Sequence, residues 1–260
     1  MRLDRELAAA RRAVAEAGNI LRKYFGEPLA VERKADASPV TAADREAEAT
    51  IVRILEAEFP SYGVLGEEFG SRGNDRVRWI VDPLDGTKSF VRGLPFFATL
   101  LALEREGEVV LGVVHEAVSG ETYYAVRGEG AYGPRGRLAV SRRSRIEESM
   151  LVFGGLQAWQ KAGRWDALGR LVARSVRQRA YGDYLGHLCV ARGQAEAMLE
   201  LDLKPWDMAA VKILVEEAGG RFTDLDGHPT IYGSGGVSSN GLVHDEVLRL
   251  LRGEIETGSG

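Results

Sequence analysis

Five consecutive runs of β-branched and aromatic residues dominate the chain between residues 62 and 132 and limit the folds that it can adopt. They are YGVLGEE, RVRWIVDP, FFATLLALERE, EVVLGVVHEA and ETYYAVRGEGAY, and they alternate with short turns that contain glycine, such as EREGE and VSGE. Such short connections close hairpins, and hairpins place consecutive strands antiparallel. This part of the chain is therefore predicted to form a largely antiparallel sheet.

Two helices are predicted before these strands. Apolar residues recur at alternating spacings of three and four over residues 3–24, which is the pattern of a helix with one buried face. Thr41 followed three residues later by Asp44 matches a capping box, and it predicts a second helix that runs to Phe59. The first half of the chain, residues 1–140, should thus place two helices against the sheet.

Strand and helix patterns alternate in the second half, residues 141–260. A strand over SMLVFGG precedes a predicted helix at residues 159–176, and later helices are expected at DYLGHLCVARG, PWDMAAVKILVEEAGG and HDEVLRLLRG. This rhythm is βαβ-like, so the chain as a whole is predicted to be an α+β protein. No linker rich in proline or serine separates the halves, and one continuous body is expected.

The charge pattern excludes several classes of protein. The formal net charge is -4, from 34 Lys and Arg against 38 Asp and Glu, without the basic stripe typical of a nucleic-acid binder. No window approaches the roughly 18 apolar residues that a membrane helix needs. The single cysteine, Cys189, rules out an intramolecular disulfide, and the charged N-terminus lacks the apolar core of a signal peptide. A cytoplasmic protein with no nucleic-acid or membrane partner is expected.

The stretch RWIVDPLDGTKSF, residues 78–90, leads an apolar strand into two carboxylates. We expect the strand to end at Asp82, because Pro83 cannot donate to a sheet ladder, which leaves the Leu84 carbonyl free as an oxygen ligand. Asp85 would then point back across the turn at Asp82. Two ionised carboxylates at such range repel each other unless a cation or a proton intervenes. Oxygen ligands suit a hard cation such as Mg²⁺, so the stretch predicts a magnesium site.

Gly86 and Thr87 follow directly and favour an anion site. A glycine lets backbone N–H groups approach a phosphate closely, and a helix that begins near Thr87 would direct its dipole there. The Thr87 hydroxyl is free to orient a water. A plain surface turn is the alternative, because Asp, Pro and Gly are turn formers. The aspartates stand three residues apart, not two as in phosphatases of the haloacid dehalogenase type, which favours metal bridging over a covalent aspartyl nucleophile.

Three further stretches supply carboxylates. Glu67 and Glu68 stand at the end of a predicted strand, and Asp207 and Asp44 stand in the first turns of predicted helices. A carboxylate is favourable in a first helical turn without any metal, so each aspartate alone has an ordinary explanation. The acidic strand ends and helix starts taken together are better explained by one shared metal site.

These motifs together resemble the inositol monophosphatase superfamily of Mg²⁺-dependent sugar and alcohol phosphatases. The resemblance rests on PVTAAD, GEE, WIVDPLDGTKSF and PWDMAAVKILVEEAGG, in the family's order, and extends over residues 31–240. It implies alternating layers of helix and sheet (an αβαβα sandwich) and a homodimer. It also implies two to three Mg²⁺ ions in the active site and hydrolysis of a phosphomonoester by an activated water.

The resemblance also implies roles for individual residues. The implied metal ligands are Glu67, Asp82, the Leu84 carbonyl, Asp85 and Asp207. Phosphate would bind the backbone N–H groups of Gly86 and Thr87. Thr87, supported by Asp44 and Glu67, would orient and deprotonate the attacking water. Residues 1–140 would thus bind metal and phosphate, and residues 141–260 would bind the substrate.

Substrate choice should depend on Gly182, Asp183 and Glu200, which match the family's positions for gripping the alcohol. Lys88-Ser89 stands where inositol-type members show an asparagine, and together with GDYLGH it resembles the histidinol-phosphate phosphatase branch. Histidinol phosphate carries an ammonium and an imidazole, with which the carboxylates of Asp183 and Glu200 would pair. The alternative is that Asp183 only caps the helix that it begins.

Other activities compete with this hypothesis. Inositol 1-phosphate is the second choice of substrate. A broader phosphatase that accepts fructose 1,6-bisphosphate or a 3′-phosphoadenosine nucleotide would need an additional basic site. A non-catalytic scaffold that binds metal is the alternative of another class, but pseudoenzymes normally lose a ligand or the water-positioning hydroxyl, and neither is missing here. A small phosphate ester is the expected partner.

Overall fold

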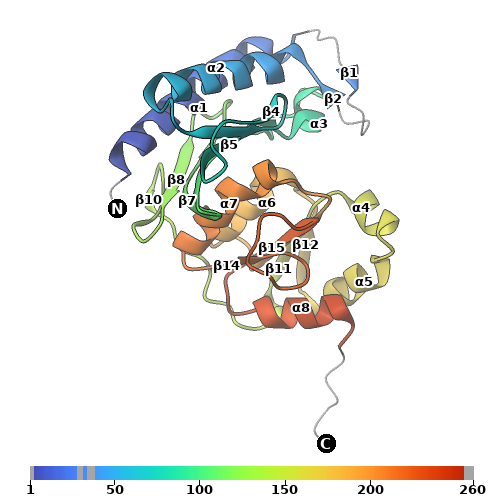
Figure 1. Cartoon of the computed structure of the whole chain (residues 1–260). Helices are drawn as coiled ribbons and strands as arrows, with labels where there is room; N and C mark the ends of the chain where they lie inside the picture. Colours follow the sequence, from blue (N-terminus) through green and yellow to red (C-terminus); the bar gives the residue numbers. More distant parts are fainter. Residues whose placement is uncertain (1–2, 28–31, 34–38, 255–260) are drawn as a thin grey trace, which may run out of the picture.

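The computed structural model describes residues 3–27, 32–33 and 39–254, and it alternates helices and sheets in layers (Figure 1). Helices α1 and α2 cover the outer face of the first sheet, α6 and α7 lie between the two sheets, and α4, α5 and α8 lie beyond the second. The predicted α+β fold with alternating layers is confirmed. The helix bounds are α1 Asp4–Tyr24, α2 Ala42–Glu58, α3 Thr87–Phe90, α4 Leu156–Lys161, α5 Trp165–Arg174, α6 Asp183–Ala191, α7 Pro205–Glu217 and α8 His244–Arg252, with a 3-10 turn at Ile146–Glu148.

The first sheet has eight strands in the order β10-β9-β8-β7-β6-β5-β3-β4. Its neighbouring strands are antiparallel, as predicted, except β3 and β5, which run parallel because the hairpin partner β4 lies between them in sequence. A separate antiparallel pair, β1 with β2, precedes α2. The strand bounds are β1 Glu32–Arg33, β2 Pro39–Val40, β3 Gly63–Gly66, β4 Gly70–Arg72, β5 Val77–Asp85, β6 Ala98–Arg105, β7 Glu108–His115, β8 Thr122–Val126, β9 Gly130–Gly133 and β10 Gly136–Arg137.

Strand β5 does not end at Asp82, and the prediction that Pro83 terminates pairing is wrong. The strand continues to Asp85 through a β-bulge, in which Pro83 and Leu84 together stand opposite the single residue Thr99 of β6. A bulge tolerates proline because the extra residue does not need to donate to the ladder. The Pro83 carbonyl instead accepts the Thr99 hydroxyl at 3.0 Å.

The second sheet has five strands in the order β12-β11-β13-β15-β14. Strand β11 is parallel to both β12 and β13, and the two pairs that involve β15 are antiparallel. The predicted single helix over residues 159–176 is wrong: α4 and α5 are separate, with Gly163 between them at a φ of 65° that a continuing helix does not allow. The strand bounds are β11 Met150–Phe153, β12 Arg177–Arg179, β13 Ala197–Leu201, β14 Arg221–Thr223 and β15 Gly235–Ser239.

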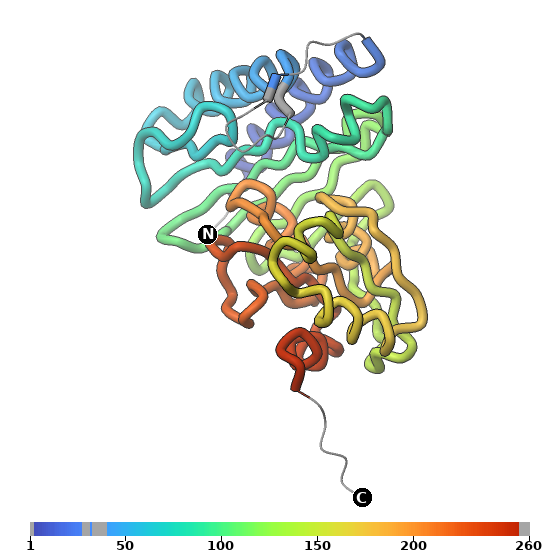
Figure 2. The backbone as a smooth tube through the Cα atoms, turned by 90° about the vertical axis from the view of Figure 1, so that its right-hand side faces the viewer, coloured from blue at the N-terminus to red at the C-terminus, as the bar shows by residue number. Residues whose placement is uncertain are grey.

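Apolar side chains fill the space between each pair of layers. The central cluster joins Leu100 and Ile80 of the first sheet to Met208 and Ile213 of α7, so residues from both halves share one core. Helix α7 lies so close to β7 that a Cβ on Gly112 would come within 3.0 Å of α7 atoms. Figure 2 shows the N-terminal half, in blue and green, stacked on the C-terminal half in this way. The expectation of one continuous body stays a prediction.

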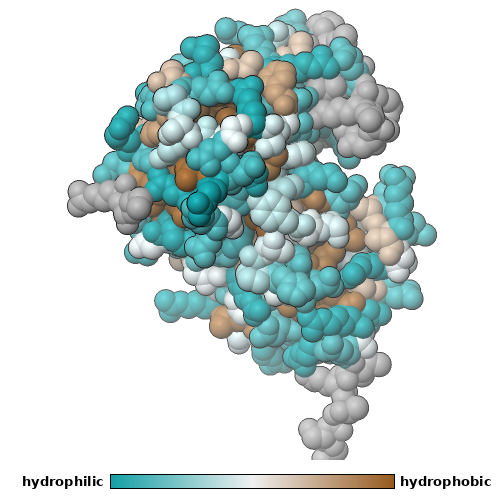
Figure 3. All heavy atoms as spheres, viewed as in Figure 1, coloured by the Kyte–Doolittle hydropathy of each residue, from teal (hydrophilic) through white to brown (hydrophobic). Residues whose placement is uncertain are grey.

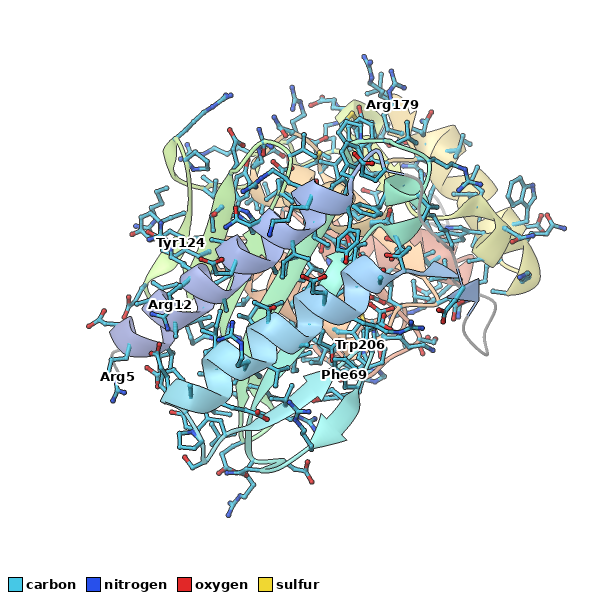
Figure 4. All side chains as sticks on the ribbon, turned by 90° about the horizontal axis from the view of Figure 1, so that it is seen from above. Arg5, Arg12, Phe69, Tyr124, Arg179 and Trp206 are labelled. Carbon is cyan, nitrogen blue, oxygen red and sulfur yellow. The ribbon has the colours of Figure 1, made fainter. Side chains whose placement is uncertain are left out.

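The outer faces are hydrophilic over most of the surface that Figure 3 shows. Helices α1 and α2 lie side by side across the first sheet when the molecule is seen from above (Figure 4). Among the described helices, none is both long and apolar enough to cross a bilayer.

Candidate active site

Three carboxylates converge where the bulge of β5 meets the start of α7. Asp82, Asp85 and Asp207 each offer an oxygen, and these oxygens all lie within 4.8 Å of one another. Asp82 and Asp85 are buried, with 2% and 7% of their surface exposed, whereas Asp207 is partly exposed. The structure therefore brings together three of the residues that the sequence predicted as metal ligands.

Local hydrogen bonds hold each of these carboxylates in place. The backbone N–H of Leu84 donates to Asp82 Oδ1 at 2.9 Å, inside the bulge. The N–H of Tyr184, in the first turn of α6, donates to Asp85 Oδ2 at 2.7 Å. The N–H of Lys204 donates to Asp207 Oδ2 at 2.7 Å, at the start of α7. Each carboxylate keeps at least one lone pair for a further ligand, because a carboxylate can accept about four hydrogen bonds.

The carboxylates of the cluster repel one another, and a bound cation would offset this repulsion. Burial, and then repulsion from Glu67 and Asp85, raises the pKa of Asp82 well above its ordinary value. Burial raises the pKa of Asp85 in the same way, with repulsion from Asp183 and Asp207 next. Burial also raises the pKa of Asp207 to about 7, although the bond from Lys204 opposes the shift. An all-oxygen set of mutually repelling carboxylates fits a hard divalent cation such as Mg²⁺.

Glu67 joins the cluster from the turn between β3 and β4. Its carboxylate lies close enough to raise the pKa of Asp82, Asp44 and Asp207. Its backbone N–H donates to the Val81 carbonyl of β5 at 3.2 Å, which ties the turn to the strand that bears Asp82. The predicted partner of the three aspartates is thus beside them, although it is supplied by a turn.

Thr87, which follows the bulge of β5, lies beside Asp44 of α2. The Thr87 hydroxyl lies 2.9 Å from the Leu84 carbonyl oxygen and 3.3 Å from Asp44 Oδ1, and it can donate to either. Asp44 Oδ2 accepts the backbone N–H of Thr41 at 2.8 Å and its hydroxyl at 2.6 Å. The predicted capping box of α2 is therefore confirmed, and the second oxygen of Asp44 still reaches Thr87. The Asp44 carboxylate can therefore cap α2 through Oδ2 and accept the Thr87 hydroxyl through Oδ1.

Gly86 turns the chain from β5 into α3. Its backbone is left-handed, at φ 87° and ψ 30°, and a Cβ there would lie 2.7 Å from the Phe96 carbonyl oxygen. Only glycine fits this position without strain. The N–H groups of Gly86 and Thr87 precede the first bonded turn of α3, so the helix supplies no acceptor for them.

The predicted substrate residues border the same cluster. Asp183 is the first residue of α6 and follows the cap residue Gly182, so its carboxylate stands in the first helical turn and the capping alternative stays open. Its φ of 51° is left-handed, which is uncommon outside glycine and frequent at functional sites. Burial raises the pKa of Asp183, and the nearby Lys88 ammonium opposes that shift. The negative charge of Asp183 in turn raises the pKa of Asp85, Asp207 and Glu200.

Glu200 of β13 lies behind Asp183. Its carboxylate accepts the backbone N–H groups of Asp183 and Gly155, and its Oε2 is buried without a partner among the described residues. Burial, followed by repulsion from Asp183 and Asp207, raises the pKa of Glu200 to about 8. An acidic subsite of two carboxylates, with the Lys88 ammonium near Asp183, therefore adjoins the three-aspartate cluster.

One buried carboxylate of this region was missed in the sequence. Glu48 of α2 is fully buried and accepts the N–H groups of Glu68 at 2.8 Å and Phe69 at 3.1 Å. Burial raises the pKa of Glu48 to about 7. Its spacing of four from Asp44, which puts both on one helix face, is the only sequence signal that could have indicated it.

Comparisons with known proteins agree with this geometry. The model of the inositol monophosphatase family matches residues 2–256. A histidinol-phosphatase of Mycobacterium tuberculosis is 41% identical over 242 residues, which cover 90% of this chain and 93% of that protein. An inositol-1-monophosphatase of Caulobacter vibrioides is 37% identical over 92% of this chain and 98% of its own length. Among solved structures, an IMPase of Thermotoga maritima superposes with a TM-score of 0.87 at 34% identity, covering 95% of this chain and 97% of that one.

Proposed function

This chain belongs to the inositol monophosphatase family and is a phosphomonoester hydrolase, and we propose that its substrate is L-histidinol phosphate, which it hydrolyses to histidinol and phosphate with Mg²⁺. The observation that carries the choice of substrate is the acidic subsite of Asp183 and Glu200 beside the metal cluster. The histidinol-phosphatases among the relatives, at 40% to 41% identity, support the same choice.

The acidic subsite suits a cationic alcohol. Histidinol presents an ammonium and an imidazole, and both can donate charge-assisted hydrogen bonds to carboxylates. A cation in the subsite would also favour the ionised form of Glu200, whose pKa is otherwise raised to about 8 by burial. Neutral inositol offers neither charge and would leave the Lys88 ammonium as the compensation that the described residues supply to Asp183 and Glu200.

The metal would be held by Glu67, Asp82, the Leu84 carbonyl, Asp85 and Asp207, with two to three Mg²⁺ ions at saturation. When bound, the metal supplies positive charge that neutralises the phosphoryl oxygens and acidifies a neighbouring water. Glu67 is close enough to both Asp44 and Asp82 to raise their pKa values, so in this proposal it binds the metal and also accepts the proton of the attacking water.

Thr87 orients the nucleophile in this proposal. With its hydrogen directed at Asp44, 3.3 Å away, the Thr87 oxygen can accept a hydrogen from water and aim the water's lone pair at phosphorus. The backbone N–H groups of Gly86 and Thr87 hold a phosphoryl oxygen, and Asp183 with Glu200 holds the departing alcohol. Such positioning supports direct in-line displacement without a phosphoenzyme.

The test compares phosphate release from histidinol phosphate, inositol 1-phosphate and fructose 1,6-bisphosphate with Mg²⁺. We expect kcat/KM to be at least tenfold higher for histidinol phosphate than for the other two substrates. In the Asp183→Asn enzyme, the KM for histidinol phosphate should rise about tenfold, because one charged hydrogen bond to the substrate is lost. The same variant should leave the KM for p-nitrophenyl phosphate, which carries no cation, unchanged. A tenfold preference for inositol 1-phosphate would refute the substrate assignment and favour the activity of the Caulobacter relative.

The remaining expectations about the molecule belong to the same proposal. Residues 1–140 would serve metal and phosphate, apart from Asp207, and residues 141–260 would serve the substrate. A homodimer is proposed because the family resemblance implies it, and light scattering on a sizing column measures it directly. A cytoplasmic location is proposed with it, as expected of an enzyme of histidine biosynthesis.

A further inference from the structure

Glu48 is a buried carboxylate that the proposed reaction does not use. None of its surface is exposed, and its two oxygens accept two consecutive backbone N–H groups, with Oε2 bonded to Glu68 and Oε1 bonded to Phe69. Burying a carboxylate is costly, and an apolar side chain would fill this space at lower cost. The position therefore does something that simple packing would not.

The bonds of Glu48 end on the turn that carries Glu67. This turn, at residues 67–69, joins β3 to the exposed edge strand β4, and Phe69 at its tip is 49% exposed. Few packing contacts are thus available to fix it. The hydrogen bond from the Glu67 N–H to β5 fixes the first residue of the turn, and the two bonds to Glu48 fix the second and third residues.

Strand β3 is shaped to admit the Glu48 carboxylate. A Cβ on Gly66, the last residue of β3, would lie closer than 3.0 Å to Glu48 Oε1. The backbone of Gly66 does not have a positive φ, so glycine is needed there for space and not for conformation. Gly66 and Glu48 therefore fit each other, directly before the metal-binding turn.

Helix α2 brings two of these functions onto one rigid element. Asp44 and Glu48 lie four residues apart and so face the same side of α2. Asp44 reaches Thr87, and Glu48 accepts the N–H groups of Glu68 and Phe69 in the turn that carries Glu67. We propose that Glu48 is a positioning residue, which fixes the turn at residues 67–69 so that Glu67 is presented to the divalent metal. The inference rests on the proposed metal-dependent function.

Metal affinity measured without catalysis tests this role. Binding of Mn²⁺ to the whole protein is titrated by the loss of the free-ion EPR signal, and the Glu48→Gln protein should bind it about tenfold more weakly, the range found when supporting residues around metal sites are replaced. Glu196→Gln is the matched control, because Glu196, directly before β13, is also buried and accepts the N–H of Met150 in β11 at 2.6 Å. It should bind Mn²⁺ as the unchanged protein does.

A second variant keeps the test decisive if Glu48→Gln fails to fold. Gly66→Ala retains Glu48 but displaces its carboxylate, so it should weaken Mn²⁺ binding in the same direction. Unchanged Mn²⁺ affinity in Glu48→Gln, or in Gly66→Ala if the former does not fold, overturns the positioning role. Asp207→Asn separates the two proposals: if removal of this direct ligand also leaves Mn²⁺ affinity unchanged, the metal site itself is wrong.

Discussion

Two adjacent glycines beside the acidic subsite offer a controlled test of how it is built. Gly154 follows β11, and a Cβ there would come closer than 3.0 Å to three side-chain atoms of Glu200. A Cβ on Gly155, the next residue, would have no atom within 4 Å, and the Gly155 φ of -57° suits alanine. Gly154→Ala should displace Glu200, whereas Gly155→Ala should not.

The size of the effect follows from what Glu200 loses. Displacement breaks its bonds with the N–H groups of Asp183 and Gly155 and moves the carboxylate away from the bound alcohol. Loss of one charged hydrogen bond to substrate costs about 1.5–3 kcal/mol, which is roughly tenfold to a hundredfold in KM. The forced overpacking costs about 1–3 kcal/mol of folding free energy, and each kcal/mol lowers Tm by roughly 2–4 °C in a protein of this size.

Steady-state kinetics with two substrates measure the effect. Gly154→Ala should raise the KM for histidinol phosphate and leave turnover of p-nitrophenyl phosphate nearly unchanged, because the metal cluster is not touched. Gly155→Ala should match the unchanged protein in both assays and in Tm. A Gly154→Ala enzyme with a normal KM for histidinol phosphate would show that Glu200 does not bind the substrate, even if its Tm falls.

Three further predictions concern charge and packing elsewhere. Asp82→Asn should abolish Mg²⁺-dependent phosphate release yet raise the Tm of the metal-free protein, because it removes one of the mutually repelling buried carboxylates; retained turnover would contradict the site. Burial lowers the pKa of His187 to about 3, below the unfolded value near 6.5, so the contribution of neutral His187 to folding stability is complete above pH 6.5 and is lost as pH falls. Urea unfolding should show that the unchanged protein loses about 2 kcal/mol of folding free energy relative to His187→Asn between pH 7 and pH 5. Parallel stability curves for the two proteins over this pH range would refute the prediction. Gly18→Ala, which in an open helix would stabilise by about 1 kcal/mol, should instead destabilise by about 1 kcal/mol, since its Cβ would lie 2.5 Å from His115 Nε2, and a rise in urea midpoint would contradict that packing.

The sequence predicts those features that depend on local patterns. The β-rich runs with glycine turns and the capping box of Thr41 and Asp44 are confirmed, because hairpins and caps are decided by residues close together in the chain. Strand β15 was missed because GGVSS lacks the bulky side chains that indicate a strand, and its place is decided by pairing with β13 and β14. The break between α4 and α5 depended on the backbone of Gly163.

The candidate site divides in the same way. The acidic residues and their motifs could be picked out from the sequence, and the structure brings Asp82, Asp85 and Asp207 together. Glu48 was not identified, because a glutamate in a charged helix is normally solvent-exposed, and its burial depends on the space left by Gly66. Local residue patterns do not predict contacts between segments that are distant in the chain.

The bulge in β5 has a consequence for the spacing of the two aspartates. Side chains alternate along a regular strand, so residues three apart would project to opposite faces. The unmatched residue in the bulge changes this parity, so that the carboxylates of Asp82 and Asp85 meet although three positions separate them. Deletion of Pro83 would leave two aspartates on one face of a regular strand, but the Leu84 carbonyl would lose its irregular setting beside Thr87. One additional residue thus converts a stretch of ordinary sheet into a bulge at which two carboxylates meet.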